Sequence, residues 1–187
     1  MKLPIALSNK HIHLSQADVD ALFGAGYELT HKKDLSQPGQ YACEEMVEVV
    51  GPKGSTKMRV LGPTRPESQV EVSLADARAL GLVVPVRQSG DVEGTPGCKL
   101  VGPKGEVEIE RGVIVASRHI HMSLEDAEKF GVKDKDIVSV QTEGERCLLF
   151  NNVLVRANAA FKLEMHVDLE EGNAAGVKNG ELVTLVK

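Results

Sequence analysis

The chain has 187 residues, which is enough for one large domain or two small ones with a buried core. Its formal net charge of −5 argues against nucleic acid as a partner, because binding nucleic acid usually requires a basic surface. No stretch near Met1 resembles a secretory signal and no window is apolar enough to span a bilayer, so we expect a cytoplasmic protein without a membrane partner.

The first segment of note, over residues 7–15, has the sequence Leu-Ser-Asn-Lys-His-Ile-His-Leu-Ser. Side chains alternate between the two faces of a strand, so His11 and His13 would point the same way if this segment is extended. Such a pair could supply two metal ligands, but an open zinc site needs at least three protein ligands. By itself such a pair is a weak signal, and it is more typical of polar residues on a half-exposed strand than of a metal site.

A short helix is predicted between Ser15 and Gly24. The Ser15 hydroxyl can accept hydrogen bonds from first-turn amides, Asp18 complements the helix dipole, and Gly24 permits a left-handed exit. The same pattern returns at residues 73–81 and 123–131. One supersecondary unit is therefore used repeatedly along the chain.

Residues 27–45 show little periodicity and contain Pro38-Gly39, so we expect a long loop that could hold one short helix or turn. His31 lies in this region, where we expect a solvated side chain. Residues 89–97 are rich in Gly and small polar residues and have the most linker-like composition of the chain, although a long hairpin loop would look the same.

Two hairpins are predicted around a repeated Gly-Pro-Lys-Gly turn, in which proline suits the second position and glycine the fourth. We expect the lysines at the two tips, Lys53 and Lys104, to be solvated. The flanking strands are predicted at residues 47–50 and 57–61 and at residues 100–101 and 107–109.

The segment Ala-Ser-Arg-His-Ile-His-Met-Ser at residues 116–123 repeats the first histidine segment and brings His119 and His121. Repetition of the pair within a longer copied segment favours metal binding over an incidental pattern. His166 lies in a predicted strand just before a helix, as the other histidines do, and is a further candidate ligand. We expect Asp168 to cap that helix, because a glutamate follows three residues later as in a capping box.

Two charged residues ahead of the second predicted helix are candidates for chemistry. Arg65 stands between Thr64 and a proline on a stiff loop, where its guanidinium could bind a phosphate through two hydrogen bonds. Glu71 could supply an oxygen ligand to a metal. Composition alone would leave both as ordinary surface charges.

The three cysteines are far apart and form no Cys-x-x-Cys motif, so we expect free thiols packed as small hydrophobic residues, without a catalytic role. They are Cys43, Cys98 and Cys147.

Short strands with a turn signal about every ten residues, together with few helices, favour barrels over an α/β sheet. We therefore predict a mainly-β protein made of two related small β-barrels with short capping α-helices.

From Ser8 to its C-terminus the chain resembles the PduL-type phosphotransacylases, also called phosphate propanoyltransferases. The resemblance rests on several motifs that match in order: Ser-Asn-Lys-His-Ile-His-Leu-Ser, Gln-Pro-Gly-Gln-Tyr, Gly-Pro-Thr-Arg-Pro with Gln69-Val-Glu71, Ser-Arg-His-Ile-His-Met-Ser, and Lys-Leu-Glu-Met-His-Val-Asp. Members of this family exchange an acyl group between coenzyme A and inorganic phosphate. They are built from two β-barrels and hold two zinc ions.

The resemblance implies six metal ligands and one phosphate contact. The ligands are His11, His13 and Glu71 for one zinc, and His119, His121 and His166 for the other. Arg65 matches the arginine that contacts phosphate.

The resemblance also implies interleaved domains. Residues 1–24 and 99–187 would form the first barrel region and residues 25–98 the second. The expected partners are acyl-CoA, with a propanoyl or acetyl group, and phosphate, and a homo-oligomer is possible. Members targeted to bacterial microcompartments carry an N-terminal amphipathic extension, which this sequence does not show, so the resemblance leaves encapsulation open.

Because no nucleophile and base pair is evident, we expect bound phosphate to attack the thioester directly. Two alternatives remain open from the sequence. An open zinc could activate water and make the protein a thioester hydrolase. Zinc could also merely stabilise a binding module that has no catalytic activity.

Overall fold

The computed structural model describes residues 1–186, which form two compact units. Unit 1 combines Met1–Asn9 with the described residues 117–186, and unit 2 is Lys10–Ala116. The sequence prediction had placed residues 10–24 and 99–116 with the C-terminal half, whereas these segments make their contacts within unit 2. Among the described residues, no helix has the length and apolar character needed to cross a membrane.

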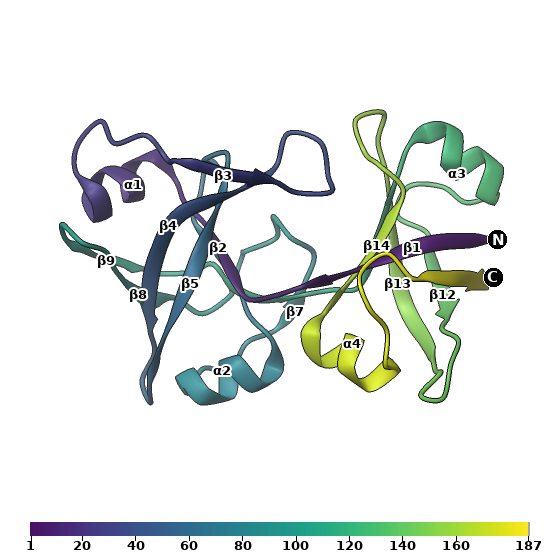
Figure 1. The fold of residues 1–187 in the computed structure, drawn as a ribbon. Helices are drawn as coiled ribbons and strands as arrows, with labels where there is room; N and C mark the ends of the chain where they lie inside the picture. The colour runs from purple at the N-terminus through teal and green to yellow at the C-terminus, as the bar shows by residue number, and fades with distance from the viewer. Residues whose placement is uncertain (187) are drawn as a thin grey trace. The chain divides into compact units, whose positions relative to one another are not determined.

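Unit 1 is a closed barrel with the strand order β1-β14-β11-β13-β12-β15. Figure 1 labels β1, β12, β13 and β14 of this barrel together with the helices α3 and α4. Its strands are β1 (Lys2–Ser8), β11 (His119–Met122), β12 (Ile137–Gln141), β13 (Leu149–Ala157), β14 (Glu164–Asp168) and β15 (Leu182–Val186). Its helices are α3 (Leu124–Phe130) and α4 (Leu169–Ala175). Alternate residues of the strands point inward and form the core of the barrel. The fully buried core residues include Leu3, Ile5, Ile120, Met122 and Met165.

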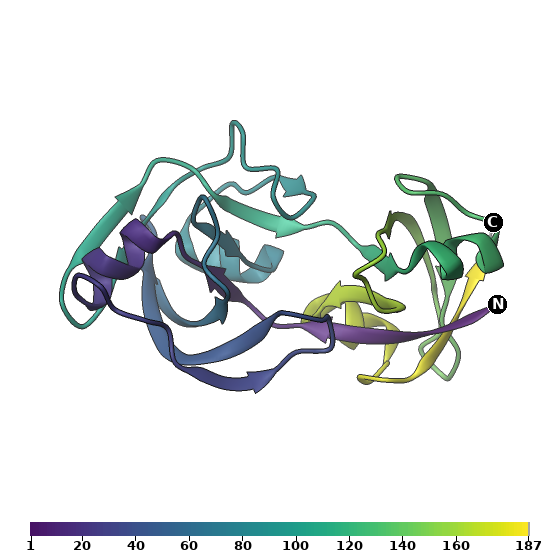
Figure 2. The ribbon, with the colours of Figure 1, turned by 90° about the horizontal axis from the view of Figure 1, so that it is seen from above.

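Unit 2 is a sheet with the order β7-β10-β6-β2-β5-β4-β8-β9, to which β3 adds by pairing with β4. Its strands are β2 (His11–His13), β3 (His31–Asp34), β4 (Tyr41–Val50), β5 (Ser55–Gly62), β6 (Gln69–Glu71), β7 (Val86–Arg87), β8 (Cys98–Val101), β9 (Glu106–Ile109) and β10 (Val113–Ala116). Its helices are α1 (Gln16–Phe23) and α2 (Leu74–Leu80). The long strand β4 is irregular between Ala42 and Met46, and this sheet curls as Figure 2 shows.

The predicted fold class is confirmed: the chain is mainly β with short helices, one unit closing as a barrel and the other curling as a half-barrel. Both predicted hairpins form, and Gly51 and Gly102 each donate a backbone hydrogen bond of 2.9 Å across the turn, to Gly54 and Gly105.

All four predicted helix starts are present, with Ser15, Ser73, Ser123 and Asp168 as N-caps. Asp168 accepts a hydrogen bond from the Glu171 amide, which confirms its expected role as a cap. The exit at Gly24 differs from the prediction: its φ of 114° and ψ of 150° lie outside the left-handed helical region that ends the other three helices.

The prediction of a long loop at residues 27–45 is wrong, because this segment contains β3 and the beginning of β4. All four residues of β3 are exposed, so the strand has no buried face that would produce an alternating hydrophobic pattern. Residues 89–97 lie within unit 2 and do not link the two units.

The two histidine strands occupy equivalent places in the two sheets. Strand β2 pairs in parallel with β5 and antiparallel with β6, and β11 pairs in parallel with β13 and antiparallel with β14. Opposite the first histidine of each strand stands another expected ligand: Glu71 faces His11, and His166 faces His119. The sequence repeat is therefore a repeat of three-dimensional structure.

Candidate metal and phosphate site

In unit 2, the antiparallel pairing of β2 with β6 brings His11, His13 and Glu71 together. The ligand atoms of these three side chains all lie within 4.8 Å of one another, and in residues 1–186 no other His, Cys, Asp or Glu group meets this criterion. The two imidazole rings are nearly perpendicular, with centroids 5.1 Å apart. The structure thus brings together the three ligands expected for the first zinc.

His13 has the properties of a neutral metal ligand. Burial lowers the pKa of His13 to about 3, and the positive charges of His11 and Arg65 act in the same direction. The ring hydrogen-bonds to the Leu61 backbone, while its Nδ1 atom is buried without a hydrogen-bond partner. A buried nitrogen lone pair of this kind is costly unless something binds it, and a cation held by the neighbouring ligands would do so.

Glu71 supplies the negative charge of the group. Burial alone would raise the pKa of Glu71, but the charge of His11 and hydrogen bonds from His11 and Ser89 hold it well below its usual value. The side chains of His11 and Glu71 are only 13% and 11% exposed. Two imidazoles and a carboxylate with little access to water form a donor set that fits zinc and leaves a fourth position open.

Arg65 is joined to this group through the hydroxyl of Ser89. Its Nη1 atom donates to Ser89 Oγ over 3.2 Å, and Ser89 Oγ donates to Glu71 Oε1 over 2.8 Å. The Gln69 amide nitrogen donates both to Ser89 Oγ, over 2.9 Å, and to Glu71 Oε1, over 2.7 Å. A backbone hydrogen bond of 2.9 Å from Arg65 to Leu14 ties the arginine loop to the end of β2. The guanidinium is therefore fixed beside the ligand group, where it can contact an anion.

Sequence reasoning missed Ser89 and assigned no role to Gln69. Ser89 falls in the segment whose composition suggested a linker, and a single serine 18 positions after Glu71 carries no recognisable signal. Gln69 lies on β6 two residues before Glu71, on the same face of the strand. That spacing was the one signal that could have identified it.

In unit 1, three imidazoles converge from β11 and β14. The ring centroids of His119, His121 and His166 lie 4.7 to 5.1 Å apart in each pair. His119 Nε2 is 3.1 Å from His121 Nε2, and His119 Nδ1 is 2.8 Å from the Ser117 carbonyl. The carbonyl orients the ring in the way that backbone acceptors orient metal-binding histidines.

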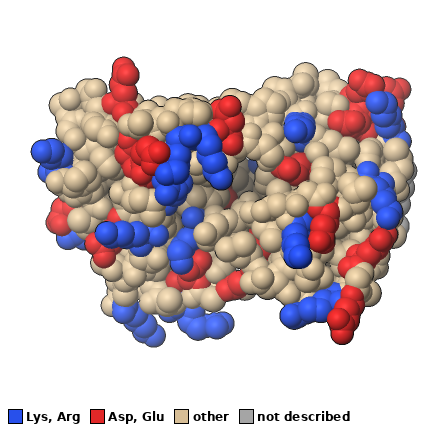
Figure 3. All heavy atoms as spheres, viewed as in Figure 1, with Lys and Arg blue, Asp and Glu red and all other residues tan. Residues whose placement is uncertain are grey.

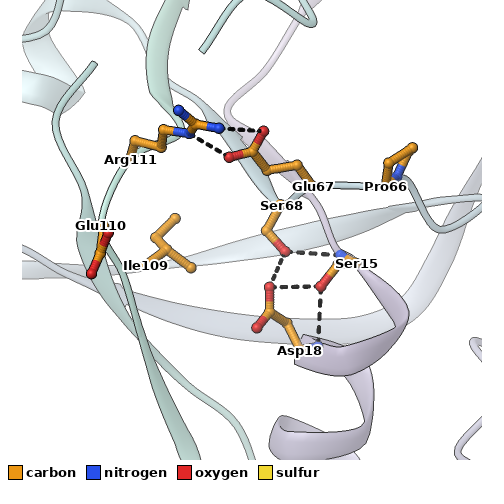
Figure 4. Close-up of a pocket in the computed structure, with 8 residues that line it drawn as sticks. All are labelled: Ser15, Asp18, Pro66, Glu67, Ser68, Ile109, Glu110 and Arg111. Carbon is orange, nitrogen blue, oxygen red and sulfur yellow. Dashed lines mark hydrogen bonds and ion pairs between the residues drawn. The ribbon is translucent and has the colours of Figure 1, made fainter. Parts of the chain in front are cut away.

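A separate hollow of unit 2, shown in Figure 4, contains polar groups that bond to one another. Asp18 accepts from the hydroxyls of Ser15 and Ser68, and the Arg111 guanidinium pairs with Glu67 over 2.6 Å. These bonds occupy the main polar groups of the hollow.

On the face of the molecule shown in Figure 3, positively and negatively charged side chains are interspersed.

The remaining candidates are not part of either cluster. His31 is exposed, as expected, and its Nε2 atom lies 2.8 Å from Asp34. Burial raises the pKa of Cys43 to about 11 and that of Cys98 to about 12, whereas Cys147 is exposed. The two buried cysteines are therefore protonated at neutral pH and are poor nucleophiles.

Comparison with known proteins identifies the family. The family model described as phosphate propanoyltransferase matches residues 4–178. The phosphate propanoyltransferase of Thermotoga maritima is 56% identical over 98% of this chain and 88% of its own length. Those of Clostridioides difficile and Salmonella typhimurium are 52% and 53% identical, over 99% and 95% of this chain and 89% and 85% of their own lengths. A match of this identity over nearly the whole length shows that the chain belongs to the phosphate propanoyltransferase family of enzymes.

Proposed function

We propose that this phosphate acyltransferase is zinc-dependent and interconverts a short-chain acyl-CoA plus phosphate with an acyl phosphate plus CoA. Propanoyl and acetyl are the proposed acyl groups. The observation that carries the proposal is the hydrogen-bonded connection from Arg65 through Ser89 to Glu71, because it joins an anion-binding guanidinium to a group of metal-ligating side chains.

His11, His13 and Glu71 would hold the zinc of unit 2. When bound there, zinc would partly neutralise the charge of phosphate and act as a Lewis acid toward an oxygen of the reacting groups. The three ligands carry one negative charge in total, since both imidazoles are neutral when they bind a metal. With the double positive charge of zinc and the single positive charge of Arg65, the site would therefore have a net positive charge, which suits a phosphate dianion.

The reaction needs no activated side chain as nucleophile. Arg65 would bind phosphate through parallel N–H donors and point one phosphate oxygen at the thioester carbonyl. The new C–O bond forms as a tetrahedral oxyanion develops, and the fixed charge of Arg65 stabilises it. Collapse of the oxyanion breaks the C–S bond, and the electron pair leaves with the CoA sulfur as thiolate. Ser89 and Gln69 would hold Glu71 and Arg65 in place during these steps.

We propose that the three imidazoles of unit 1, from His119, His121 and His166, hold a second zinc. Their convergence in the fold and the carbonyl contact of His119 support this assignment.

Product analysis tests the proposed reaction. The protein is incubated with acetyl-, propanoyl- or butanoyl-CoA, with and without phosphate, and thiol release and products are measured. We expect thiol release that depends on phosphate, with acyl phosphate as the product. Free acid formed without phosphate would instead show a thioester hydrolase. Absence of thiol release in the zinc-loaded protein would show a binding module.

A further inference from the structure

The short strands β2 and β6 are cross-linked at both ends by side chains that precede one strand and contact the helix that follows the other. Lys10 stands immediately before β2, and its Nζ atom donates to Asp76 Oδ1 of α2 over 2.6 Å. Ser68 stands immediately before β6, and its hydroxyl donates to Asp18 of α1 (Figure 4). Because the strands are antiparallel, the start of each lies beside the end of the other. One cross-link is therefore at each end of the pair.

The two carboxylate oxygens of Asp76 have separate partners. Oδ2 accepts from the Ser73 hydroxyl over 3.1 Å and belongs to the capping box at the start of α2. Oδ1 accepts from Lys10. Because one oxygen is enough for the capping box, the contact with Lys10 is additional to the helix cap. It ties the start of α2 to the start of β2.

The same contact is present in unit 1 with different residues. Arg118 stands immediately before β11, and its Nε atom lies 2.6 Å from Glu171 Oε1. The other oxygen of Glu171 accepts from the Asp168 amide over 3.0 Å in the capping box of α4. A lysine with an aspartate in one unit and an arginine with a glutamate in the other make the same link. The link therefore follows from the position in the fold and not from one pair of residues.

The cross-links of unit 2 flank the metal-ligating group. A slip of β2 by two residues along β6 would keep the side chains on the same face, but it would move His11 about 7 Å from its place opposite Glu71. The ligand atoms of the group lie within 4.8 Å of one another, so such a slip would disperse them. Each strand has only three residues and so few backbone hydrogen bonds to resist it.

Both cross-links are partly or fully shielded from water. The side chains of Lys10 and Asp76 are 29% and 22% exposed, whereas those of the surface pair Lys129 and Glu125 are 58% and 75% exposed. Water and salt weaken a partly buried ion pair less than an exposed one. Ser68 is buried, and its Oγ atom also accepts from the backbone amide that begins the cap of α1 over 2.8 Å. These contacts are therefore stronger restraints than surface pairs.

We infer that Lys10 and Ser68 are positioning residues, which fix β2 against β6 and so hold the metal-ligating side chains together. Those side chains are His11, His13 and Glu71. The inference rests on the zinc assignment of the proposed function. Loss of a cross-link should therefore lower the affinity for zinc more than it lowers the stability of the fold.

Zinc binding by full-length variants tests the inference. The H166A background removes one imidazole of the unit 1 cluster, so that tightly held zinc reports on unit 2. Adding K10M removes the charge of Lys10 and keeps most of its length. We expect the zinc dissociation constant, measured by competition with a chelator, to rise roughly 10-fold. K129M, which breaks the exposed pair with Glu125, is the matched control and should leave the constant unchanged.

Three further variants distinguish positioning from a general structural role. K10R should restore most of the affinity, because an arginine makes the equivalent contact in unit 1. D76N keeps an oxygen for the capping box but loses the charge that binds Lys10, so it should weaken zinc binding as K10M does, and the double variant should be no weaker than K10M. S68A should also weaken zinc binding. A purely structural role would lower the unfolding temperature of the metal-free protein and leave the dissociation constant unchanged.

The outcomes separate the inference from the proposed function. If the H166A protein binds no zinc, the zinc assignment of unit 2 is wrong and the inference fails with it. If it binds zinc and both K10M and D76N bind it as K129M does, the inference alone is overturned. If K10M does not fold, D76N decides, since its helix cap is retained. An S68A affinity equal to that of K129M would remove Ser68 from the positioning residues.

Discussion

His11 Nε2 lies 3.4 Å from Glu71 Oε2, across the antiparallel strands β2 and β6. Neither strand is longer than three residues, so the pair depends on the register of the sheet and not on local sequence. A shift by one residue would turn the side chains of either strand to the opposite face and would disperse the ligand group.

Zinc content should fall by about one ion per chain in the H11A variant, because two ligands rarely suffice for tight zinc binding. Metal analysis after dialysis against a weak chelator measures this loss. H31A is the matched control, since His31 is exposed on β3 and contacts Asp34 instead of the ligand group. An H11A protein with the zinc content of the parent would remove His11 from the ligand set.

Loss of Arg65 should weaken both phosphate binding and turnover. Removing a charged contact to a partly desolvated anion costs roughly 2–4 kcal/mol, which corresponds to a fall in kcat/KM for phosphate of roughly 30- to 900-fold. Steady-state kinetics of the R65A variant at varied phosphate measures the effect. R111A, whose guanidinium pairs with Glu67 in the separate hollow, should keep nearly normal kinetics. Equal kinetics for the two variants would place the phosphate elsewhere.

Substitution of Ser89 by alanine should also lower activity, through loss of positioning. The variant leaves Arg65 and Glu71 each without one hydrogen bond, and a hydrogen bond to a charged group contributes roughly 1.5–3 kcal/mol. We therefore expect kcat/KM to fall roughly 10- to 150-fold. S139A is the control, because the Ser139 hydroxyl bonds to Asn151 in an exposed part of unit 1. Kinetics of S89A like those of S139A would show that the Ser89 link is dispensable.

The cysteines should react very unequally with a thiol reagent at pH 8. Cys147 is exposed and should react quickly, whereas Cys43 and Cys98 are buried and their pKa values are raised to about 11 and about 12. Because only the thiolate reacts, these two should be modified only after unfolding. A colorimetric thiol titration with and without denaturant measures the three groups.

The low reactivity of the buried cysteines also predicts that the reaction does not pass through an acyl group bound to a cysteine. Incubation with acyl-CoA in the absence of phosphate should leave the mass of the intact protein unchanged. An acyl adduct on any cysteine would refute direct transfer to phosphate.

Local features of the fold follow from the sequence with little help from tertiary structure. Each helix start has a capping residue whose side chain bonds to an amide three positions on, and each Gly-Pro-Lys-Gly turn folds back within four residues. The repeat of the His-Ile-His segment likewise indicated two equivalent strands. The matching antiparallel pairings of β2 with β6 and of β11 with β14 confirm it.

The exposed strand β3 could not be predicted, because nothing in its own residues marks a buried face. Its place is fixed by hydrogen bonds to β4, which depend on the neighbouring chain.

The residue types at the candidate site were visible in the sequence, since His-x-His pairs, a loop arginine and a glutamate suggest metal and phosphate chemistry before any fold is known. The partner that orients two of them was not visible: Ser89 contacts both Arg65 and Glu71 from a loop. A hydrogen bond or a ligand contact depends on distances of a few ångströms between side chains. Those distances are set by strand register and packing, which only the folded chain defines.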